Sequence, residues 1–277
     1  MNEQRVESAY AGQPVHHDEA NFHDQWAQNT NVEDVPVYGA FEAPTALENQ
    51  FILHRMGDLR DKRLLDIGAG LGESSVYFAL KGASVTATDI SPEMTRLAQE
   101  LASVHGVSIE TAVGPAEELD VPSESFDLVY IANTIHHVQD RACLFKHIAR
   151  VLKPGGCFFA WDPLAYNPAI KIYRRIATEV RTEDEQPLTF ADLITARRYF
   201  VGVRHREFWI ASLALFGKYY LIDRVNPNTD RYWKRIYRET TAGLWWWWPL
   251  KAADTALTRL PLVRRLAWNM VMWGTKA

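Results

Sequence analysis

The stretch LLDIGAGLGESS, residues 64–75, decides the fold. Its apolar start is typical of a buried strand, and Gly68, Gly70 and Gly72 then form a turn before a helical pattern begins. Glycine lets the backbone come close to a ligand, and the N–H groups at the start of a helix attract an anionic group. The stretch therefore predicts a ligand-binding turn between a strand and a helix.

The composition is that of an ordinary globular protein, with 47% hydrophobic and 23% charged residues among 277. A chain of this length can bury one substantial core. The net charge of −4 conceals a split, because residues 163–277 carry +9 and residues 1–162 carry −13. Eight of the ten tryptophans also lie in the later part. We expect the two parts to contact different partners.

No apolar run reaches the roughly 18 residues that a membrane-spanning helix needs, and the first residues are polar. The sequence therefore predicts a soluble, unprocessed, cytoplasmic protein. The two cysteines, Cys143 and Cys157, belong to no CxxC motif and no Cys/His cluster. Neither a disulfide nor a metal site is expected.

Short apolar runs alternate with helical patterns between residues 63 and 161. Strands that alternate with helices at this spacing predict a parallel sheet, buried on both faces. The predicted strands are Arg63–Ile67, Ser84–Thr88, Ser108–Ala112, Phe126–Ala132 and Gly156–Trp161, and the predicted helices are Glu73–Lys81, Ser91–Val104 and Asp140–Leu152.

The glycine turn does not match the dinucleotide-binding pattern GxGxxG. The position of the third glycine is taken by Glu73 in one frame and by Ser75 in the other. The turn instead has the pattern GxGxG, with Asp66 two residues before the first glycine. This difference argues against a nicotinamide cofactor.

Residues 66–72, DIGAGLG, resemble motif I of the class I S-adenosylmethionine-dependent methyltransferases. Four further features follow in that family's order: Asp89 at the end of the second strand, Glu117 after the third, SFDLV at 125–129 and LKPGG at 152–156. The resemblance covers about residues 60–165, and Ala267–Lys276 resembles the family's last strand.

The resemblance implies an α/β, Rossmann-like fold with a seven-stranded, mostly parallel sheet whose last strand is antiparallel. It also implies an N-terminal helical lid and helical cap insertions over the acceptor. The expected boundaries are residues 1–60 for the lid, 61–165, 199–209 and 264–277 for the cofactor-binding core, and 166–198 and 210–263 for the cap.

The implied cofactor is S-adenosyl-L-methionine, with S-adenosyl-L-homocysteine as the product. It carries a carboxylate, an ammonium and a sulfonium. By the resemblance, Asp66 receives the ammonium directly or through water, and Asp89 binds both ribose hydroxyls. The expected cofactor-binding residues are Asp66, Gly68, Gly70, Gly72, Asp89, Ile90, Ala116, Glu117 and Asn133. Pro115 stands where many relatives have an acid, so Glu117 or the backbone must contact the adenine.

Methyl transfer is an in-line displacement that depends on holding the nucleophile near the methyl group. A general base is needed only when the acceptor must lose a proton. In this family the loop after the fourth strand, here residues 133–138, borders the methyl group. His136 and His137 are the candidate catalytic bases. The alternative is that they only pack and form hydrogen bonds under the cofactor.

Four residues after the fifth strand are candidate acceptor-binding residues. Tyr166 and Asn167 either face the acceptor or form a turn. Arg174 and Arg181 either bind a phosphate or carboxylate of the acceptor or belong to a solvated helix face.

The run Trp245–Trp248, with Lys234, Arg235 and Arg238 nearby, indicates the class of acceptor. Four adjacent tryptophans cannot all point inward, so some are expected to be exposed or to line an apolar cavity. This favours an apolar or amphipathic acceptor, of lipid, prenyl or quinone type with an anionic group, and a contact with a membrane surface.

Other functions stay open at this point. One is methylation of a soluble natural product or sugar hydroxyl, with the tryptophans in a homodimer interface. Another is a protein that binds the cofactor without catalysis. Nucleic acid is not an expected partner, because the sequence pI is about 6.1 and no RNA-binding module is attached.

Overall fold

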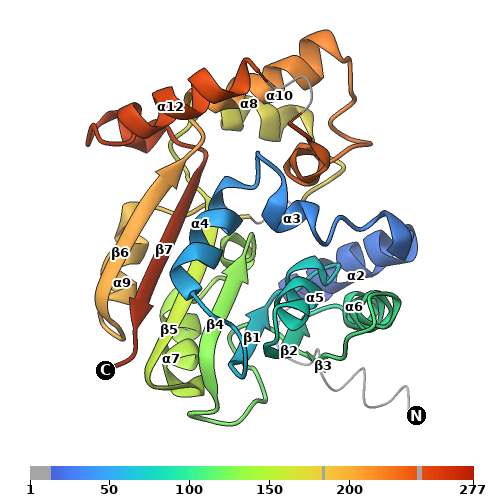
Figure 1. The fold of residues 1–277 in the computed structure, drawn as a ribbon, viewed down its shortest axis with the longest axis vertical. Helices are drawn as coiled ribbons and strands as arrows, with labels where there is room; N and C mark the ends of the chain where they lie inside the picture. Colours follow the sequence, from blue (N-terminus) through green and yellow to red (C-terminus); the bar gives the residue numbers. More distant parts are fainter. Residues whose placement is uncertain (1–13, 183–184, 242–244) are drawn as a thin grey trace.

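The computed structural model describes residues 14–182, 185–241 and 245–277. They form a seven-stranded sheet in the order β3-β2-β1-β4-β5-β7-β6 (Figure 1). The neighbours pair in parallel except that β7 is antiparallel to both β5 and β6, which confirms the predicted sheet. The strands are β1 (Arg63–Ile67), β2 (Ser84–Asp89), β3 (Glu110–Val113), β4 (Phe126–Ala132), β5 (Leu152–Pro163), β6 (Val201–Phe208) and β7 (Asn269–Thr275).

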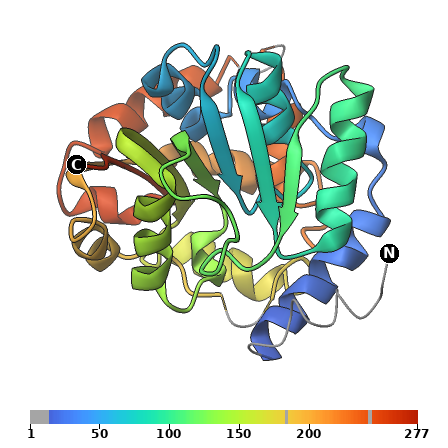
Figure 2. The same ribbon diagram turned by 90° about the horizontal axis from the view of Figure 1, so that it is seen from below.

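Helices cover both faces of this sheet (Figure 2). Successive strand residues enter different apolar clusters, as Leu64 and Leu65 do. One cluster includes helices α3 (Gly39–Glu42), α4 (Leu47–Met56), α5 (Glu73–Leu80) and α6 (Pro92–Val104). The other includes α7 (Arg141–Val151) and α9 (Phe190–Ala196). Burial on both faces explains why the strands are continuously apolar.

Two helices begin as their sequences predict. The Ser91 hydroxyl accepts a hydrogen bond of 3.0 Å from the N–H of Met94, and Pro92 opens α6. The Asp140 carboxylate accepts one of 2.9 Å from the N–H of Cys143 and caps α7. Each cap satisfies a backbone donor that the first turn leaves without a partner.

The glycine turn has the left-handed backbone that glycine permits, with φ of +69° at Gly68, +54° at Gly70 and +86° at Gly72. A Cβ atom at Gly72 would lie 2.6 Å from the Cβ of Ala98 on α6. At Gly68 it would lie 2.2 Å from the Thr134 hydroxyl oxygen. The turn therefore depends on glycine both for its conformation and for its contacts with two neighbouring segments.

The remaining segments gather at the carboxyl ends of the parallel strands. Helix α2 (Pro14–Gln28) packs against α6, and Figure 1 shows the cap helices at one end of the sheet. The cap comprises α8 (Pro168–Ile176), η3 (Ala211–Leu213), α10 (Ala214–Gly217), η4 (Lys218–Ile222), α11 (Tyr232–Arg235), η5 (Ile236–Arg238), α12 (Trp247–Leu257) and η6 (Val263–Leu266). A short helix, η1 (Val32–Asp34), follows α2, and η2 (Ile135–His137) follows β4.

Two helices that the expected boundaries assign to the cap and to the lid pack against the core instead. Helix α9, expected in the cap, packs against α7 beside the sheet. Helix α4, expected in the lid, packs on β7 and buries Ile52 in the core. Among the described residues, no helix combines the length and the apolar character needed to cross a membrane.

Gly72→Ala should lower the free energy of unfolding by about 2–5 kcal/mol, because it combines left-handed strain with a steric clash against Ala98. Gly70→Ala is the matched control: it has the same strain, but a Cβ there meets nothing within 4 Å. Its expected cost is only about 1–2 kcal/mol. Urea denaturation of both variants would measure the difference, and equal losses would contradict the role of Ala98.

Candidate functional site

A cavity lies where β1, β2, β4 and β5 end, and it is enclosed by α2 and the cap. Eleven of the predicted site residues line it: Gly68, Gly70, Asp89, Ile90, Ala116, Glu117, Asn133, His136, His137, Arg174 and Arg181. Four predicted residues are not part of its lining: Asp66, Gly72, Tyr166 and Asn167. The structure thus gathers most of the predicted cofactor-binding and catalytic residues, and two of the predicted acceptor-binding residues, around one cavity.

Asp89 is fixed at the end of β2 by two backbone donors. Its Oδ2 accepts a hydrogen bond of 2.9 Å from the N–H of Gly70, and its Oδ1 accepts one of 2.9 Å from the N–H of Ser91. Burial raises the pKa of this carboxyl. Each carboxylate oxygen can accept a further hydrogen bond. Asp89 can therefore bind a pair of hydroxyls without moving.

Asp66 makes two contacts within the protein that the sequence did not predict. It is buried under the turn, and its Oδ2 accepts hydrogen bonds from the hydroxyls of Ser74 at 2.7 Å and Ser75 at 2.6 Å. Burial raises its pKa to about 6, against the effect of these hydroxyls. Asp66 thus fastens the first turn of α5 to β1 and does not face the cavity.

Glu73 and Lys234 lie at the same end of the cavity and were not singled out by the sequence as cofactor-binding residues. Glu73 is the first residue of α5, and its Oε1 forms an ion pair with the Nζ of Lys234 on α11. The other oxygen, Oε2, is buried and has no hydrogen-bond partner among the described residues. Because they are 161 positions apart, no local pattern could have joined them.

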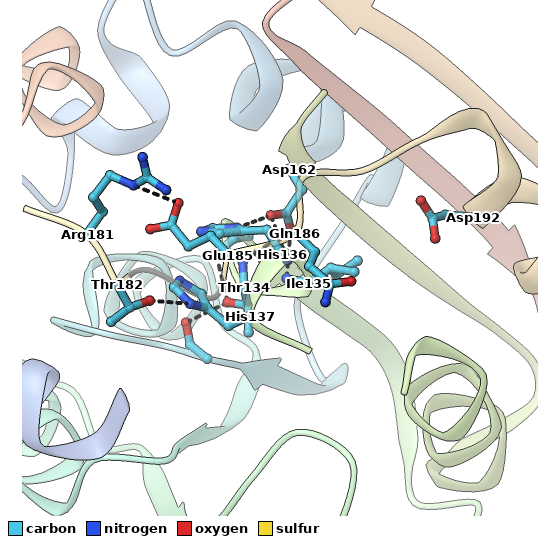
Figure 3. Close-up of polar contacts among 12 residues, drawn as sticks. Thr134, Ile135, His136, His137, Asp162, Arg181, Thr182, Glu185, Gln186 and Asp192 are labelled. Carbon is cyan, nitrogen blue, oxygen red and sulfur yellow. Dashed lines mark hydrogen bonds and ion pairs between the residues drawn. The ribbon is translucent and has the colours of Figure 1, made fainter. Parts of the chain in front are cut away.

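His136 is held by a buried carboxylate at the end of β5. Asp162 accepts hydrogen bonds from the backbone N–H groups of Thr134, Ile135 and His136 at 2.9–3.2 Å, and it also pairs with the Nδ1 of His136 (Figure 3). Burial acts to lower the pKa of His136, but the Asp162 carboxylate outweighs it, so that pKa is raised. Asp162 thus fixes the loop and keeps a positive charge favourable at His136.

His137 has the opposite electrostatic setting. Burial and the neighbouring His136 ring, 4.0 Å away between centroids, lower its pKa. Its Nδ1 lies 2.9 Å from the Oε1 of Glu19 on α2, and that carboxylate also contacts His23 at 2.8 Å. Burial acts to raise the pKa of Glu19, but these two imidazoles outweigh it and keep the group ionised. Since a carboxylate only accepts, His137 Nδ1 carries the hydrogen and Nε2 is the basic nitrogen.

The two candidate arginines share one acid. Glu185 lies 2.6 Å from the guanidinium of Arg174 and 3.3 Å from that of Arg181, and Figure 3 shows the second pair beside His136. Two guanidinium groups against one carboxylate leave a net positive charge at the cavity wall. An anionic group of an acceptor would be attracted there.

Tyr166 and Asn167 form structural contacts outside the cavity. The Tyr166 hydroxyl accepts a hydrogen bond of 3.3 Å from the N–H of Phe190, and the two rings stack. The Asn167 side chain caps α8 and donates to the carbonyl of Leu266. These contacts correspond to the turn that was the alternative for both residues.

Eight aromatic residues of the lining form an aromatic wall: Phe22, Trp26, Tyr130, Trp161, Tyr173, Trp233, Tyr237 and Trp268. Asn49 fixes two of them, since its Oδ1 accepts from the Tyr130 hydroxyl at 2.6 Å and from the Trp161 Nε1 at 2.9 Å. A wall of this kind suits a flat, apolar molecule.

Within the described part of the chain, two groups of side chains have ligand atoms within 4.8 Å of one another: Glu19, His23 and His137, and His136, His137 and Glu185. The first group is already joined through the carboxylate of Glu19. The absence of a metal site therefore stays a prediction.

The residues present fit S-adenosylmethionine. Asp89 offers two oxygens for ribose hydroxyls, the glycine turn exposes backbone close to the cavity, and the unpaired Oε2 of Glu73 offers an acceptor to an ammonium. A dinucleotide would instead place its negatively charged pyrophosphate beside the carboxylates of Asp89 and Glu73, which would repel it.

Comparison with known proteins agrees with this fit. Residues 65–160 match a family described as a methyltransferase domain. The chain is 37% identical over 103 residues to a ubiquinone biosynthesis O-methyltransferase of Xanthomonas oryzae pv. oryzae, covering 37% of this chain and 43% of that protein. It is 34% identical over 114 residues to a demethylmenaquinone methyltransferase of Chlorobaculum parvum, covering 40% and 46%. The match thus spans less than half the length of these relatives.

Solved structures share the fold over a longer part of the chain. A phosphoethanolamine N-methyltransferase 2 of Haemonchus contortus, solved with S-adenosyl-L-methionine, has a TM-score of 0.55 at 22% identity over 83% of this chain and 52% of that one. The cyclase SpnF has a TM-score of 0.54 at 18% identity over 84% and 80%. The fold, the glycine turn and the matched residues together identify a class I S-adenosylmethionine-dependent methyltransferase domain in this chain.

Proposed function

We propose that this protein transfers a methyl group from S-adenosylmethionine to a hydroxyl of an apolar or amphipathic small molecule, of lipid, prenyl or quinone type. One observation carries the proposal: a single cavity joins Asp89 and the glycine turn to a polarised imidazole and an aromatic wall. The proposed roles of the other residues follow from what each part of the cavity lining can bind.

When bound, the cofactor supplies an electrophilic methyl group on its sulfonium. Asp89 would hold the ribose hydroxyls, while Gly68 and Gly70 let the backbone approach. Ala116 and Glu117 line the cavity beyond β3, where the adenine is expected. Helix α2 contributes His16, Glu19 and His23 to this end of the cavity, and its cover would reduce solvent screening of the contacts beneath it.

His137 is the proposed base. Its lowered pKa keeps the ring neutral at neutral pH, and Glu19 holds Nδ1–H so that Nε2 can accept the acceptor's proton. The ionised Glu19 then stabilises the imidazolium that forms. His136, tied to Asp162, positions the loop that carries His137.

The acceptor would lie between the aromatic wall and the arginine pair. Its apolar part would contact rings such as Trp161 and Trp268, and an anionic substituent would face Arg174 and Arg181. Two relatives of the matched domain are named for ubiquinone biosynthesis and demethylmenaquinone methylation, which supports a quinone-type acceptor.

The cap has a surface suited to an anionic bilayer. Within the tryptophan run, Trp247 is buried against Trp209, whereas Trp245 is 80% exposed and Trp248 is 47% exposed. Residues 210–266 hold ten Lys or Arg and four acids. All four acids have donors in the structure: Asp223 pairs with Lys218, Asp230 with Arg235, Glu239 with Tyr219 and Asp254 with backbone N–H groups. Exposed tryptophan beside uncompensated cations favours anionic headgroups.

Incubation with methyl-labelled S-adenosylmethionine and a demethylated quinol should place label in the organic phase. Asp89→Ala should lower that yield, because the ribose loses a carboxylate that makes two charge-assisted hydrogen bonds, and the Kd for S-adenosylhomocysteine should rise at least about tenfold. Asp120→Ala, at an exposed position outside the cavity, is the control. In a second incubation, an extract of the host replaces the quinol. Label on a water-soluble product other than S-adenosylmethionine would indicate a soluble acceptor, and label that remains entirely on S-adenosylmethionine would indicate binding without catalysis.

The rate should fall as the pH drops below the pKa of His137, which lies under 6.5, because the protonated ring cannot accept a proton. His137→Gln should remove this limb and reduce kcat about 100-fold or more, with little change in cofactor affinity. His147→Gln, whose ring also has a lowered pKa but lies outside the cavity, should change neither. An unchanged pH profile in His137→Gln would exclude His137 as the general base. A rate abolished by EDTA would point to a metal instead.

Flotation with vesicles tests the cap surface. The protein should bind vesicles that contain phosphatidylglycerol more than vesicles of phosphatidylcholine alone, and Trp245→Ser/Trp248→Ser should reduce binding. Val104→Ser/Ile194→Ser is the matched control, since both side chains are exposed and lie outside the cap. If the tryptophan variant instead halves the mass in analytical ultracentrifugation, the surface is a homodimer interface.

A further inference from the structure

The cavity has a charged pair at the end where the glycine turn lies. Glu73 follows Gly72 directly, and Lys234 reaches it from α11 in the cap. Both residues line the cavity, and their side chains are 8% and 23% exposed. They present one carboxylate and one ammonium side by side at the position where motif I ends.

Other described cations of the cavity serve elsewhere. Arg174 and Arg181 are both bound to Glu185, near His136. Among the described lysines and arginines that line the cavity, Lys234 is therefore the one next to the glycine turn. Burial lowers its pKa to about 8, against the effect of Asp66, so it remains mostly charged at neutral pH.

Glu73 has an unused acceptor. Its Oε1 takes the ion pair with Lys234, while its Oε2 is buried without a hydrogen-bond partner in the described part of the chain. A buried carboxylate oxygen without a donor costs free energy, so a bound donor would be favoured there. Asp66, the acid expected to take that donor, accepts the Ser74 and Ser75 hydroxyls on its Oδ2 and is not part of the cavity lining.

We propose that Glu73 and Lys234 form the subsite for the amino-acid end of the cofactor. Glu73 Oε2 accepts from its α-ammonium, and Lys234 Nζ donates to its α-carboxylate. Opposite charges on the protein thus match opposite charges on the ligand, in a partly desolvated place where both contacts are strong. This inference rests on the proposed function, because it assumes that the ligand is S-adenosylmethionine.

The assignment makes the cap part of the cofactor site. Trp26 of α2 lies beside α11 of the cap. Its ring centre is 3.9 Å from the Arg231 guanidinium and 5.8 Å from Lys234 Nζ. Helix α2, the cap and the cofactor's amino-acid end then meet at one point. The cofactor would thus contact, at one place, segments that are about 200 positions apart in the sequence.

Calorimetry with two ligands tests the subsite. S-adenosylhomocysteine carries the amino-acid end, whereas 5′-methylthioadenosine keeps the adenosine and lacks that end. Lys234→Met should raise the Kd for S-adenosylhomocysteine at least about tenfold and leave the Kd for 5′-methylthioadenosine within about twofold. Lys234→Arg should recover part of the loss. Lys218→Met, which removes another paired cap lysine outside the cavity, should change neither Kd.

The double variant Glu73→Gln/Lys234→Met separates a direct contact from simple charge neutralisation. If Lys234 binds the carboxylate, the double variant stays weak for S-adenosylhomocysteine. Recovery of the wild-type Kd would show that Lys234 only neutralises Glu73, and it would overturn the proposal. Equal losses for both ligands in Lys234→Met would overturn it as well. A wild-type protein that binds neither ligand would refute the proposed function itself.

Discussion

The hydrogen bond from the N–H of Gly70 to the carboxylate of Asp89 joins the turn after β1 to the end of β2, and the site is arranged around it. It forms only if the turn is tight enough to place its backbone beside the neighbouring strand. Left-handed glycines give that shape, and Gly72 then starts α5 against Ala98 of α6. Strands β1 and β2, helices α5 and α6 and the carboxylate of Asp89 are therefore held together by a turn of five residues. A larger side chain at either contact would separate these elements.

Buried acids organise the rest of the cavity, each by a different kind of partner. Asp66 binds two hydroxyls and holds α5, Asp162 binds three backbone N–H groups and His136, and Glu19 binds two imidazoles. A buried carboxylate is tolerated only when such donors replace water. The result is a pair of adjacent histidines with opposite pKa shifts, one raised by Asp162 against the effect of burial and one lowered by burial and by its neighbour. Environments that separate two pKa values are typical of acid–base sites.

The strands and helices of the core could be predicted because each depends on local patterns. Continuous apolar runs marked β1 and β4, Ser91 with Pro92 marked the start of α6, and the turn pattern marked the cofactor end. What could not be predicted depends on contacts between distant segments. Nothing near Asp66 showed that two serines of the following helix would occupy it, and nothing near Glu73 pointed to Lys234. Tyr166 and Asn167 follow β5 as acceptor-binding residues do, yet they serve Phe190 and α8, which only the packing of α9 and the cap determines.

Asp24 on α2 accepts hydrogen bonds from the Ser91 hydroxyl and from the N–H of Glu93, so this helix is fastened to the first turn of α6. Its neighbour Trp26 rests on Arg231 of the cap. Both attachments lie in the second half of α2, whereas Glu19 meets His137 in the first half. Because α2 is one continuous helix, its contacts with α6, with the cap and with His137 are linked through a single rigid element. A substitution that disturbs one of these contacts would therefore be transmitted along the helix to the other two, even though they belong to three separate parts of the chain.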